Sequence, residues 1–473
     1  MRLFFLAVLA ACSSVLFAQT DIEVHIDDYA EPYLLLANYY GDKQYIRDTM
    51  RRTPRGTYRV QRDTSLAGGM YLLVLPPENQ FVQLLIDPAD VTFKVKTKKD
   101  DLVGEMDIDG NADNARFYKY LQLLNQQRPK AEALRAELEA AAEGDKAAIQ
   151  EQLEAVNKVV TDRQAKILKE APESLTAAVV RLNQPLSPPP FAELPDEQQR
   201  QAQLYWMQQH YFDQLDLSDP RLARTPFLQQ RIEFYTTNFT VQHPDSLSKA
   251  IDYILERAAG TEENYKFVLV HFLNKFAKTK QVGMDAVYVH LAKNYYCTGK
   301  APWTDAEQVE KICANAKTLD PLLIGKTAPD VQLQTRDGQK LKISDIEGDY
   351  TVLLFWRPDC GHCKKSAPQV VEFAEKWQPQ GVRMVSVCTK FTKDVPKCWE
   401  FIDEKGFGDF LNLVDPYHQS KFQTIYDLKS TPRIFVLDKD KKIVSKGIGA
   451  EQLDEVMEFL IKRDKAEATE EGE

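Results

Sequence analysis

Residues 356–368 read WRPDCGHCKKSAP, with Cys360 and Cys363 placed between an apolar run and a segment of helical pattern. The apolar run before them predicts a β-strand, and the segment after them predicts a helix that begins at the cysteines. Further along, residues 430–435 read STPRIF, a Thr-Pro pair that enters a second apolar strand. Two closely spaced cysteines at the start of a helix indicate a redox-active pair of thiols.

The position of Cys360 suits nucleophilic chemistry. A helix N-terminus stabilises a negative sulfur through its dipole and its free backbone N–H groups, so it favours the reactive thiolate. His362, between the two cysteines, can add an imidazolium or a hydrogen-bond donor. Cys363 lies one helical turn further on, close enough to resolve a mixed disulfide formed at Cys360. The predicted catalytic residues are therefore Cys360, Cys363 and His362.

Other uses of a Cys-x-x-Cys pair fit the sequence less well. Haem attachment needs a histidine directly after the second cysteine, and Lys364 stands there. A zinc site needs two further ligands at short spacing, and none is nearby. A peroxidatic cysteine is typically preceded, three residues earlier, by Thr or Ser, whereas Arg357 stands here. A passive structural disulfide stays open as an alternative. We expect no metal and no cofactor.

Composition narrows the functional classes further. The chain has 473 residues and a net charge of −10, without a basic block, so nucleic-acid binding is not expected. Apart from Cys12, the cysteines fall into neighbouring pairs, which suits an oxidising compartment. For Cys388 and Cys398 the sequence favours two inert or weakly paired thiols, with a structural disulfide or a second redox relay as alternatives. Cys297 and Cys313 form either a stapling disulfide or two buried thiols.

The N-terminus indicates export. Residues 1–18 combine a short basic start with an apolar core, which is typical of a signal peptide cleaved after Ala18. The alternative is a lipoprotein motif that would anchor the mature protein through a lipid on Cys12. No other segment approaches the ~20 apolar residues that a membrane span needs. We therefore expect a periplasmic protein with no transmembrane segment in the mature chain.

The pattern along the chain predicts a multidomain protein. Short apolar runs between turn residues predict a β-sandwich, and Ala, Glu, Leu and Lys then dominate a helical region. Aromatic pairs in that region could line a groove but more often form core packing. The expected parts are a signal peptide (1–18), a β-sandwich (19–112), an all-α region (113–320, with a long hairpin at 114–169 followed by helices in 171–320), an α/β domain (321–465) and an acidic disordered tail (466–473).

Strand and helix patterns alternate in the C-terminal part, which favours a mostly parallel central sheet with an antiparallel edge. Asp337-Gly338 between two short strands predicts a hairpin. The other elements expected there are strands at 351–356, 382–387, 434–437 and 442–446, and helices at 364–377, 397–404, 417–426 and 452–462.

Residues 322–463 resemble the TlpA/ResA-like branch of the thioredoxin superfamily. The likeness rests on GKTAP at 325–329, the Phe-Trp before the Cys-x-x-Cys pair, a proline inside the following helix, and Thr431-Pro432. It implies a thioredoxin-like fold, a cis proline, and substrate docking by Thr431, Pro432 and Trp356. The order of domains is similar to Gram-negative envelope proteins described as thiol-disulfide oxidoreductases. Implied partners are envelope proteins with cysteines or disulfides and an inner-membrane electron donor or acceptor.

The sequence departs from that pattern at two positions where related proteins have a carboxylate that accepts protons. Leu354 stands where thioredoxin has a buried aspartate, and Ser366 stands where this branch often has a glutamate. The Gly-His dipeptide matches protein disulfide isomerase, which implies an oxidising potential of about −180 mV. A redox-inactive binding or scaffold protein of the cell envelope, using the thioredoxin-like domain for recognition, is the alternative function.

Overall fold

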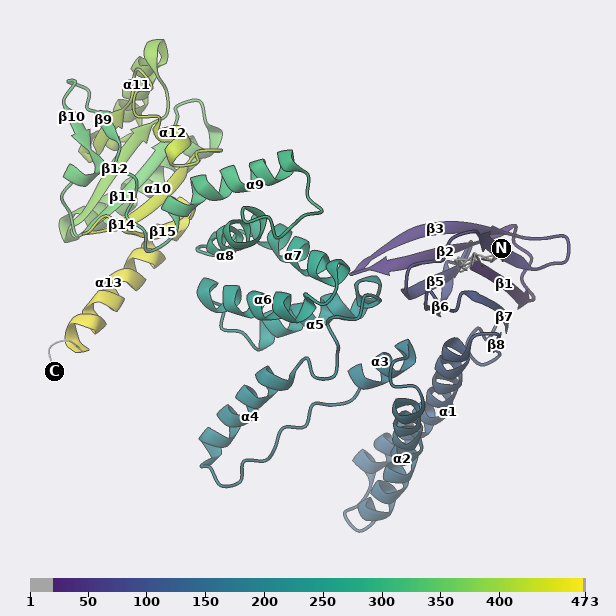
Figure 1. Cartoon of the computed structure of the whole chain (residues 1–473). Coiled ribbons are helices and arrows are strands. Elements are labelled where there is room, and N and C mark those ends of the chain that lie inside the picture. Colours follow the sequence, from purple (N-terminus) through teal and green to yellow (C-terminus); the bar gives the residue numbers. More distant parts are fainter. Residues whose placement is uncertain (1–19, 471–473) are drawn as a thin grey trace, which may run out of the picture. The chain divides into compact units, whose positions relative to one another are not determined.

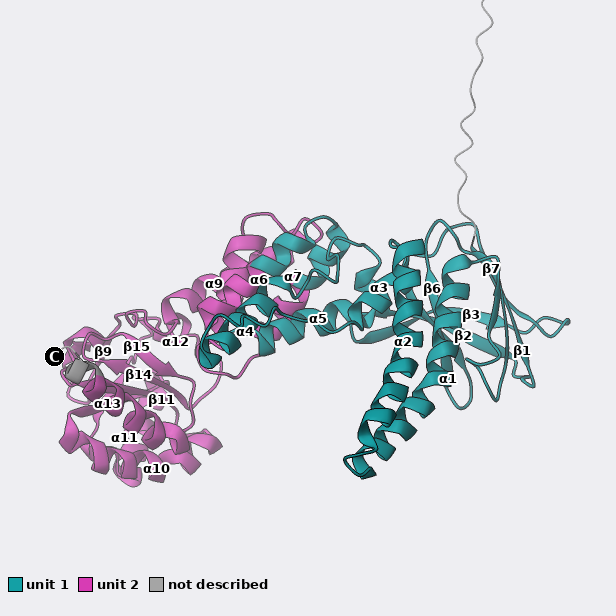
Figure 2. Ribbon diagram, turned by 90° about the horizontal axis from the view of Figure 1, so that it is seen from below, with its two compact units in different colours: residues 1–240, 253–268 teal, residues 241–252, 269–473 magenta. Residues whose placement is uncertain are grey.

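The computed structural model describes residues 20–470 and divides into two compact units (Figure 2). The first unit comprises the residues up to 240 together with 253–268, and the second comprises 241–252 and the residues from 269 onward. The expected signal peptide (1–18), its cleavage point and Cys12 lie outside the described residues. Among residues 20–470, no helix combines the length and the apolarity that crossing a membrane requires.

The first unit begins with the predicted β-sandwich (Figure 1). Its two four-stranded sheets have the orders β4-β1-β7-β8 and β3-β2-β5-β6. Strand β7 buries every second residue, the pattern of a strand with one face on a core. The strands are β1 (Thr20–Asp27), β2 (Tyr33–Tyr40), β3 (Lys43–Arg51), β4 (Tyr58–Arg62), β5 (Gly69–Leu75), β6 (Gln80–Ile86), β7 (Thr92–Lys98) and β8 (Asp107–Asp109).

The expected long helical hairpin follows the sandwich. Asn111 caps its first helix, and Asn114 exchanges hydrogen bonds of 2.8 and 2.6 Å with the backbone of Leu85, which fastens that helix to strand β6. Two helices, α6 and α7, are divided between the units. The helices up to this point are α1 (Ala112–Ala140), α2 (Lys146–Glu170), α3 (Leu175–Leu182), α4 (Asp196–His210), α5 (Pro226–Asn238), α6 (Pro244–Ala258) and α7 (Glu262–Ala277).

The second unit continues with helices α8 (Asp285–Leu291) and α9 (Ala306–Leu319), and a π-helix, η2 (Ala292–Tyr296), directly follows α8. A disulfide between Cys297 and Cys313 joins the end of the π-helix to α9. Of the two alternatives from the sequence, a stapling disulfide and two buried thiols, the structure has the disulfide. Cys297 is exposed, so the bridge lies at the surface.

The C-terminal part has the α/β thioredoxin-like fold, built on a seven-stranded sheet of order β10-β9-β13-β12-β11-β14-β15 (Figure 1). Its strands are β9 (Gln332–Gln334), β10 (Lys340–Lys342), β11 (Tyr350–Trp356), β12 (Val382–Cys388), β13 (Leu411–Val414), β14 (Arg433–Asp438) and β15 (Ile443–Lys446). Its helices are α10 (Gly361–Trp377), α11 (Val395–Lys405), α12 (Phe422–Ile425) and α13 (Leu453–Glu470).

The prediction of a mostly parallel sheet is wrong. In the described sheet only β11 with β12 and β12 with β13 pair in parallel, and the other neighbours are antiparallel. The hairpins β9–β10 and β14–β15 add strands at both edges, and hairpins are antiparallel by construction. Strand β13 was not predicted, because four residues that include a polar asparagine give no clear periodicity.

Strand β11 is the centre of this sheet and is buried along its whole length. Successive side chains point to opposite faces, so Val352, Leu354 and Trp356 join one hydrophobic cluster while Leu353 and Phe355 join another. The first cluster contains residues of α10, α11 and α13, and the second contains residues of α12. An apolar run without alternation is therefore the signature of a strand covered on both sides.

Two C-terminal helices differ from expectation. The helix expected over 417–426 is reduced to α12, because the Asp415 carboxylate accepts the N–H groups of Gln419 and Ser420 and holds a loop there. The last helix, α13, continues to Glu470, into the segment expected to be a disordered tail.

Candidate active site

The first cysteine is held at the N-terminus of a long helix. Strand β11 ends at Trp356, and Cys360 is the N-cap residue of α10, where its sulfur accepts the backbone N–H of Cys363 at 3.3 Å. A cysteine at this position meets the positive end of the helix dipole and otherwise unsatisfied N–H groups. The local sequence therefore places a sulfur where negative charge is favoured.

The two cysteines lie beside the Thr-Pro loop. Both carry free thiols and are nearly buried, Cys360 at 7% and Cys363 at 4% exposure. The Cys360 thiol donates to the backbone carbonyl of Thr431 at 3.2 Å, and the Thr431–Pro432 peptide bond is cis. Strand β14, which follows this loop, pairs antiparallel with β11 and so brings the loop to the end of β11 where the cysteines begin.

The surroundings separate the acidities of the two thiols. Burial opposes ionisation of Cys360, but hydrogen bonds from the Cys363 thiol, Thr431 and the backbone N–H groups of Cys363 and His362 outweigh it and hold the pKa of Cys360 below its usual value. Burial, followed by the hydrogen bond to Cys360, raises the pKa of Cys363. Cys360 is therefore the thiol that ionises first.

The Thr431 hydroxyl is placed to serve that thiolate. It is buried, and within residues 20–470 it has no hydrogen-bond partner. A buried hydroxyl without a partner is costly, and a thiolate at Cys360 would supply the missing acceptor. This residue therefore contributes to the site through both its carbonyl and its hydroxyl group.

Charged side chains surround the entrance to the site. Asp359 pairs with Lys390 at 2.8 Å and with Arg357 at 3.6 Å, and the hydrogen bond from Lys390 is the main reason that the pKa of Asp359 is lowered. The negative charge directly before Cys360 is thus offset by two cations. His362 is exposed, and its ring makes no hydrogen bond with any described residue, so it lies free at the rim.

Trp356 lies in a different place from the one expected for a docking residue. It is only 1% exposed, stacks on Phe401 with ring centroids 4.5 Å apart, and donates from its indole N–H to the Ser386 hydroxyl at 3.1 Å. Its side chain lies in the hydrophobic cluster that contains residues of α10 and α11, so it cannot reach a docked chain. The expected role in substrate docking is therefore wrong for Trp356, which packs beneath the site.

The positions expected to relay protons carry no carboxylate. Leu354 is buried in the hydrophobic cluster that contains the two cysteines. The Ser366 hydroxyl donates to the Cys363 carbonyl at 3.3 Å, as helical serines often do. Neither side chain can accept the proton of Cys363 as a carboxylate would. A carboxylate that relays this proton is therefore missing at both positions.

A groove next to Cys360 was missed by the sequence analysis. It has a volume of about 240 Å³, and it shares Thr431 with the cysteine site. Its lining includes three cations and no carboxylate: Arg357, Thr389, Lys390, Phe391, Gln423, Leu428, Lys429, Ser430 and Thr431. The loop after β12 forms one wall, where Gln423 donates to the Thr389 carbonyl at 2.7 Å. Loops from three separate segments meet here, and the sequence offered no motif that joins them.

The second cysteine pair of this domain is bridged. Cys388 and Cys398 form a disulfide, which the sequence analysis held as an alternative to two inert or weakly paired thiols. Both residues are 0% exposed. Cys388 ends β12 and Cys398 lies in α11, and the helix returns across the end of the strand, a geometry that their spacing of 10 residues did not reveal.

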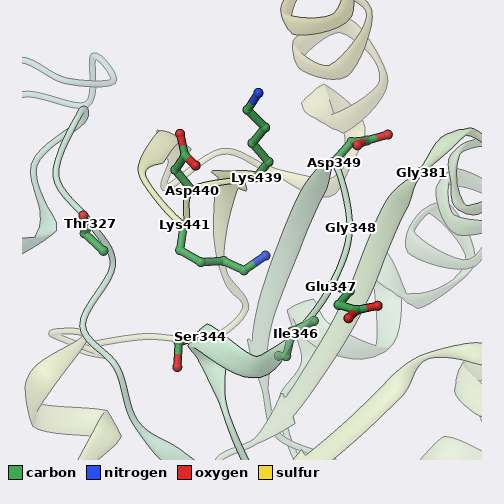
Figure 3. Close-up of a pocket in the computed structure, with 10 residues that line it drawn as sticks. All are labelled: Thr327, Ser344, Ile346, Glu347, Gly348, Asp349, Gly381, Lys439, Asp440 and Lys441. Atoms are coloured by element: carbon green, nitrogen blue, oxygen red, sulfur yellow. The ribbon is translucent and has the colours of Figure 1, made fainter.

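Another hollow, of about 680 Å³, lies at the opposite end of the sheet (Figure 3). The Lys441 side chain reaches into it, and its amine donates to the Thr351 hydroxyl at 2.9 Å. Burial lowers the pKa of Lys441. Thr351 lies near the start of β11, whereas the cysteines follow its end, so this hollow is separate from the thiol chemistry. Residues 20–470 contain no cluster of three or more His, Cys, Asp or Glu side chains that could hold a metal.

Comparisons with known proteins find similar proteins for the C-terminal part of the chain and a family match for its middle part. Residues 324–446 match the AhpC/TSA family, and residues 161–320 match a domain of unknown function, DUF5106. The thiol-disulfide oxidoreductase ResA of Bacillus thuringiensis (strain Al Hakam) is 30% identical over 147 residues, which cover 30% of this chain and 80% of the relative. ResA of Bacillus subtilis (strain 168) is 28% identical over 120 residues, covering 25% of this chain and 64% of that protein.

A solved structure is also similar. A domain of a possible thiol-disulfide isomerase from Cytophaga hutchinsonii is 33% identical to this chain. The match covers 32% of this chain and 98% of that domain, with a TM-score of 0.29.

Proposed function

The chain belongs to the ResA-like thiol-disulfide oxidoreductases of the thioredoxin superfamily, and from this we propose that it is an exported enzyme that exchanges its Cys360–Cys363 dithiol and disulfide with cysteine-containing proteins of the cell envelope. The observation that carries the proposal is the pair of free thiols at the start of α10, with Cys360 the more acidic and in contact with the Thr431 carbonyl. The thiolate is the form of cysteine that attacks disulfides, and a helix N-terminus favours that form.

In the reducing direction, the Cys360 thiolate attacks one sulfur of a substrate disulfide. A bond forms between Cys360 and that sulfur, the substrate disulfide breaks, and the other substrate sulfur leaves as a thiolate. Cys363 then loses its proton and attacks Cys360, which forms the Cys360–Cys363 disulfide and releases the second substrate thiolate. Two electrons pass from the enzyme dithiol to the substrate, and the reverse sequence oxidises a substrate dithiol.

Deprotonation of Cys363 is the difficult part of this cycle. Burial and the neighbouring Cys360 raise the pKa of Cys363 while both thiols are reduced. Once Cys360 is held in a mixed disulfide it carries no charge, so its unfavourable influence on the Cys363 thiolate falls away. Because Leu354 and Ser366 replace carboxylates, we propose that water or His362 accepts this proton.

A substrate chain would lie along Thr431 and Pro432 and continue into the groove of about 240 Å³ beside Cys360. An extended peptide can pair with the backbone of a loop through main-chain hydrogen bonds, while side-chain pockets add selectivity. The groove offers Arg357, Lys390 and Lys429 with no carboxylate in its lining. Asp359 pairs with Arg357 and Lys390, and Asp427 pairs with Lys429, so three cations stand against two carboxylates. The remaining positive charge favours substrates that carry acidic side chains near the reactive cysteine.

Export to the periplasm is supported by the pattern of residues 1–18 and by two disulfides outside the Cys360–Cys363 pair. Such bridges persist in oxidising compartments and are rare in the cytosol. In that compartment an electron donor or acceptor at the inner membrane would reset the pair after each turnover, since the described chain contains no second redox domain of its own.

Reduction of insulin by the full mature chain, with a small dithiol as the electron source, tests the proposal. Catalysed reduction is expected for the wild-type protein and for a variant in which Cys297 and Cys313 are both replaced by serine. Loss of turnover is expected for Cys360→Ser. A wild-type protein no faster than Cys360→Ser would instead indicate a binding or scaffold protein without redox activity.

A further inference from the structure

A second polar cavity, of about 400 Å³, lies within the second compact unit. It is bounded by the segment that links α7 to α8, by α9, and by the first residue of β14 with the end of β15. The residues that matter for its chemistry are Lys280, Asp285, Lys429, Arg433 and Lys446.

The charges in this cavity do not balance. Four of these side chains are cations, and the lining contains a single carboxylate, Asp285. That carboxylate is committed to Lys446, whose amine lies 2.5 Å from it and also 2.5 Å from the Leu322 carbonyl. Lys429 pairs with Asp427 at 3.1 Å. Arg433 and Lys280 make no ion pair with any described residue, so two positive charges are left without a partner.

Arg433 is the more informative of the two. Its Nε is buried and has no hydrogen-bond partner within residues 20–470. The guanidinium lies 5.8 Å from the centroid of the Phe435 ring, a contact that engages its face and leaves its N–H edge unused. A buried donor left unpaired costs free energy, and a guanidinium edge matches the two oxygens of a carboxylate or phosphate.

The backbone next to Arg433 makes room for this arrangement. Gly447 has a positive φ of 66°, and a Cβ there would lie 3.1 Å from Nη1 of Arg433. A side chain at this position would press on the guanidinium as well as strain the backbone. The glycine thus leaves the guanidinium in place at the wall of the cavity.

We propose that this cavity is a binding site for a small oxyanion, a carboxylate or a phosphate, held by the guanidinium of Arg433 and the amine of Lys280. The anion supplies the acceptor that Arg433 lacks and neutralises the two unpaired cations. The site does not depend on the redox chemistry, although it borders the active site through the chain itself, since Arg433 directly follows Pro432.

Isothermal titration calorimetry of the full reduced protein tests the proposal, with inorganic phosphate in one arm and succinate in the other at constant ionic strength in chloride. Saturable binding of at least one anion is expected, and the tighter of the two identifies the ligand chemistry. Arg433→Gln should weaken binding roughly tenfold or more, because hydrogen bonds to a charged group are lost. Lys280→Gln should weaken it about threefold, as expected for one exposed charge.

Arg383→Gln is the matched control, because Arg383 is an exposed arginine of the same domain outside the cavity, and it should bind within twofold of wild type. Absence of saturable binding in both arms overturns the proposal. Equal affinity of the wild type and Arg433→Gln also overturns it. If Arg433→Gln does not fold, as judged by circular dichroism, Lys280→Gln decides, and unchanged affinity in that variant counts against the site.

Discussion

Two cysteine pairs lie at the ends of neighbouring strands in this protein and differ in chemistry. Cys360 and Cys363 follow β11, whereas Cys388 ends β12 opposite Trp356 and is bridged to Cys398. All four cysteines belong to the same hydrophobic cluster. Membership of this cluster therefore does not distinguish a pair proposed to react from a pair that holds the fold together.

The difference lies in what surrounds each sulfur. The thiolate of Cys360 can accept hydrogen bonds from N–H groups at the start of α10, from the Cys363 thiol and from Thr431. The side chain of Cys360 is 7% exposed. Cys388 and Cys398 are 0% exposed, so an external thiolate cannot approach them in line with the S–S bond. The reactive pair therefore differs from the bridged pair in the exposure of its attacking sulfur and in the stabilisation of the Cys360 thiolate.

The largest effect is expected from removing the attacking sulfur. Cys360→Ser should lower the rate of insulin reduction by more than roughly a hundredfold, as loss of a nucleophile does in other enzymes. The double variant Cys388→Ser/Cys398→Ser is the matched control and should keep its rate per folded molecule within a few-fold of wild type. Greater loss in the control than in Cys360→Ser would reverse the assignment of the two pairs.

The same double variant should instead lose stability. The Cys388–Cys398 bridge closes a loop of 10 residues, and chain-entropy arguments give about 2–3 kcal/mol for a loop of that size. Chemical denaturation followed by a spectroscopic probe in the C-terminal domain measures this change. An unchanged midpoint would show that the bridge does not hold α11 onto β12.

The acidity of Cys360 should depend on Thr431. Because the pKa of Cys360 is lowered, its alkylation by iodoacetamide should reach half of its maximal rate at a pH below the ordinary thiol value of about 8.5. Thr431→Val removes one donor to the thiolate, which should raise the pKa of Cys360 and slow alkylation at pH 7 by roughly three- to tenfold.

Thr389→Val is the control for that measurement, because Thr389 lines the same groove without contributing to the acidity of Cys360. Its pH profile should match the wild type. A shift as large as that of Thr431→Val would mean that the polarity of the groove, and not the Thr431 hydroxyl, sets the acidity.

The smallest effect is expected at Trp356. Trp356→Phe keeps an aromatic ring against Phe401 and loses the hydrogen bond to Ser386, whose hydroxyl retains Asn412 as a partner at 2.6 Å. The free energy of unfolding should fall by about 1 kcal/mol, while KM for insulin stays unchanged. A raised KM with unchanged stability would restore the docking role that burial excludes.

Much of this site could be predicted from local sequence. The continuous apolar run of β11, the cysteines after it and the helical pattern behind them fix the placement of Cys360 without any long-range information. The hairpin at Asp337-Gly338 and the long hairpin α1–α2 were predicted for the same reason, since each depends on contacts between nearby residues.

Features that depend on the meeting of distant segments were not predicted. The spacing of Cys388 and Cys398 in the sequence does not indicate that α11 returns over the end of β12. The groove beside Thr431 combines the loops that contain Arg357, Lys390 and Lys429, and no local pattern joins them. The position of Trp356 was misjudged because a resemblance gives the residue type but not the depth at which the side chain is buried.

Trapping of the covalent intermediate tests the central claim most directly. Cys363→Ser keeps the attacking thiol and removes the resolving one, so a disulfide-containing substrate peptide should remain attached to the protein. Mass spectrometry of the trapped complex should find the peptide linked to Cys360, with Cys388–Cys398 still bridged. A complex linked to Cys388 or Cys398, or no complex at all, would contradict the account.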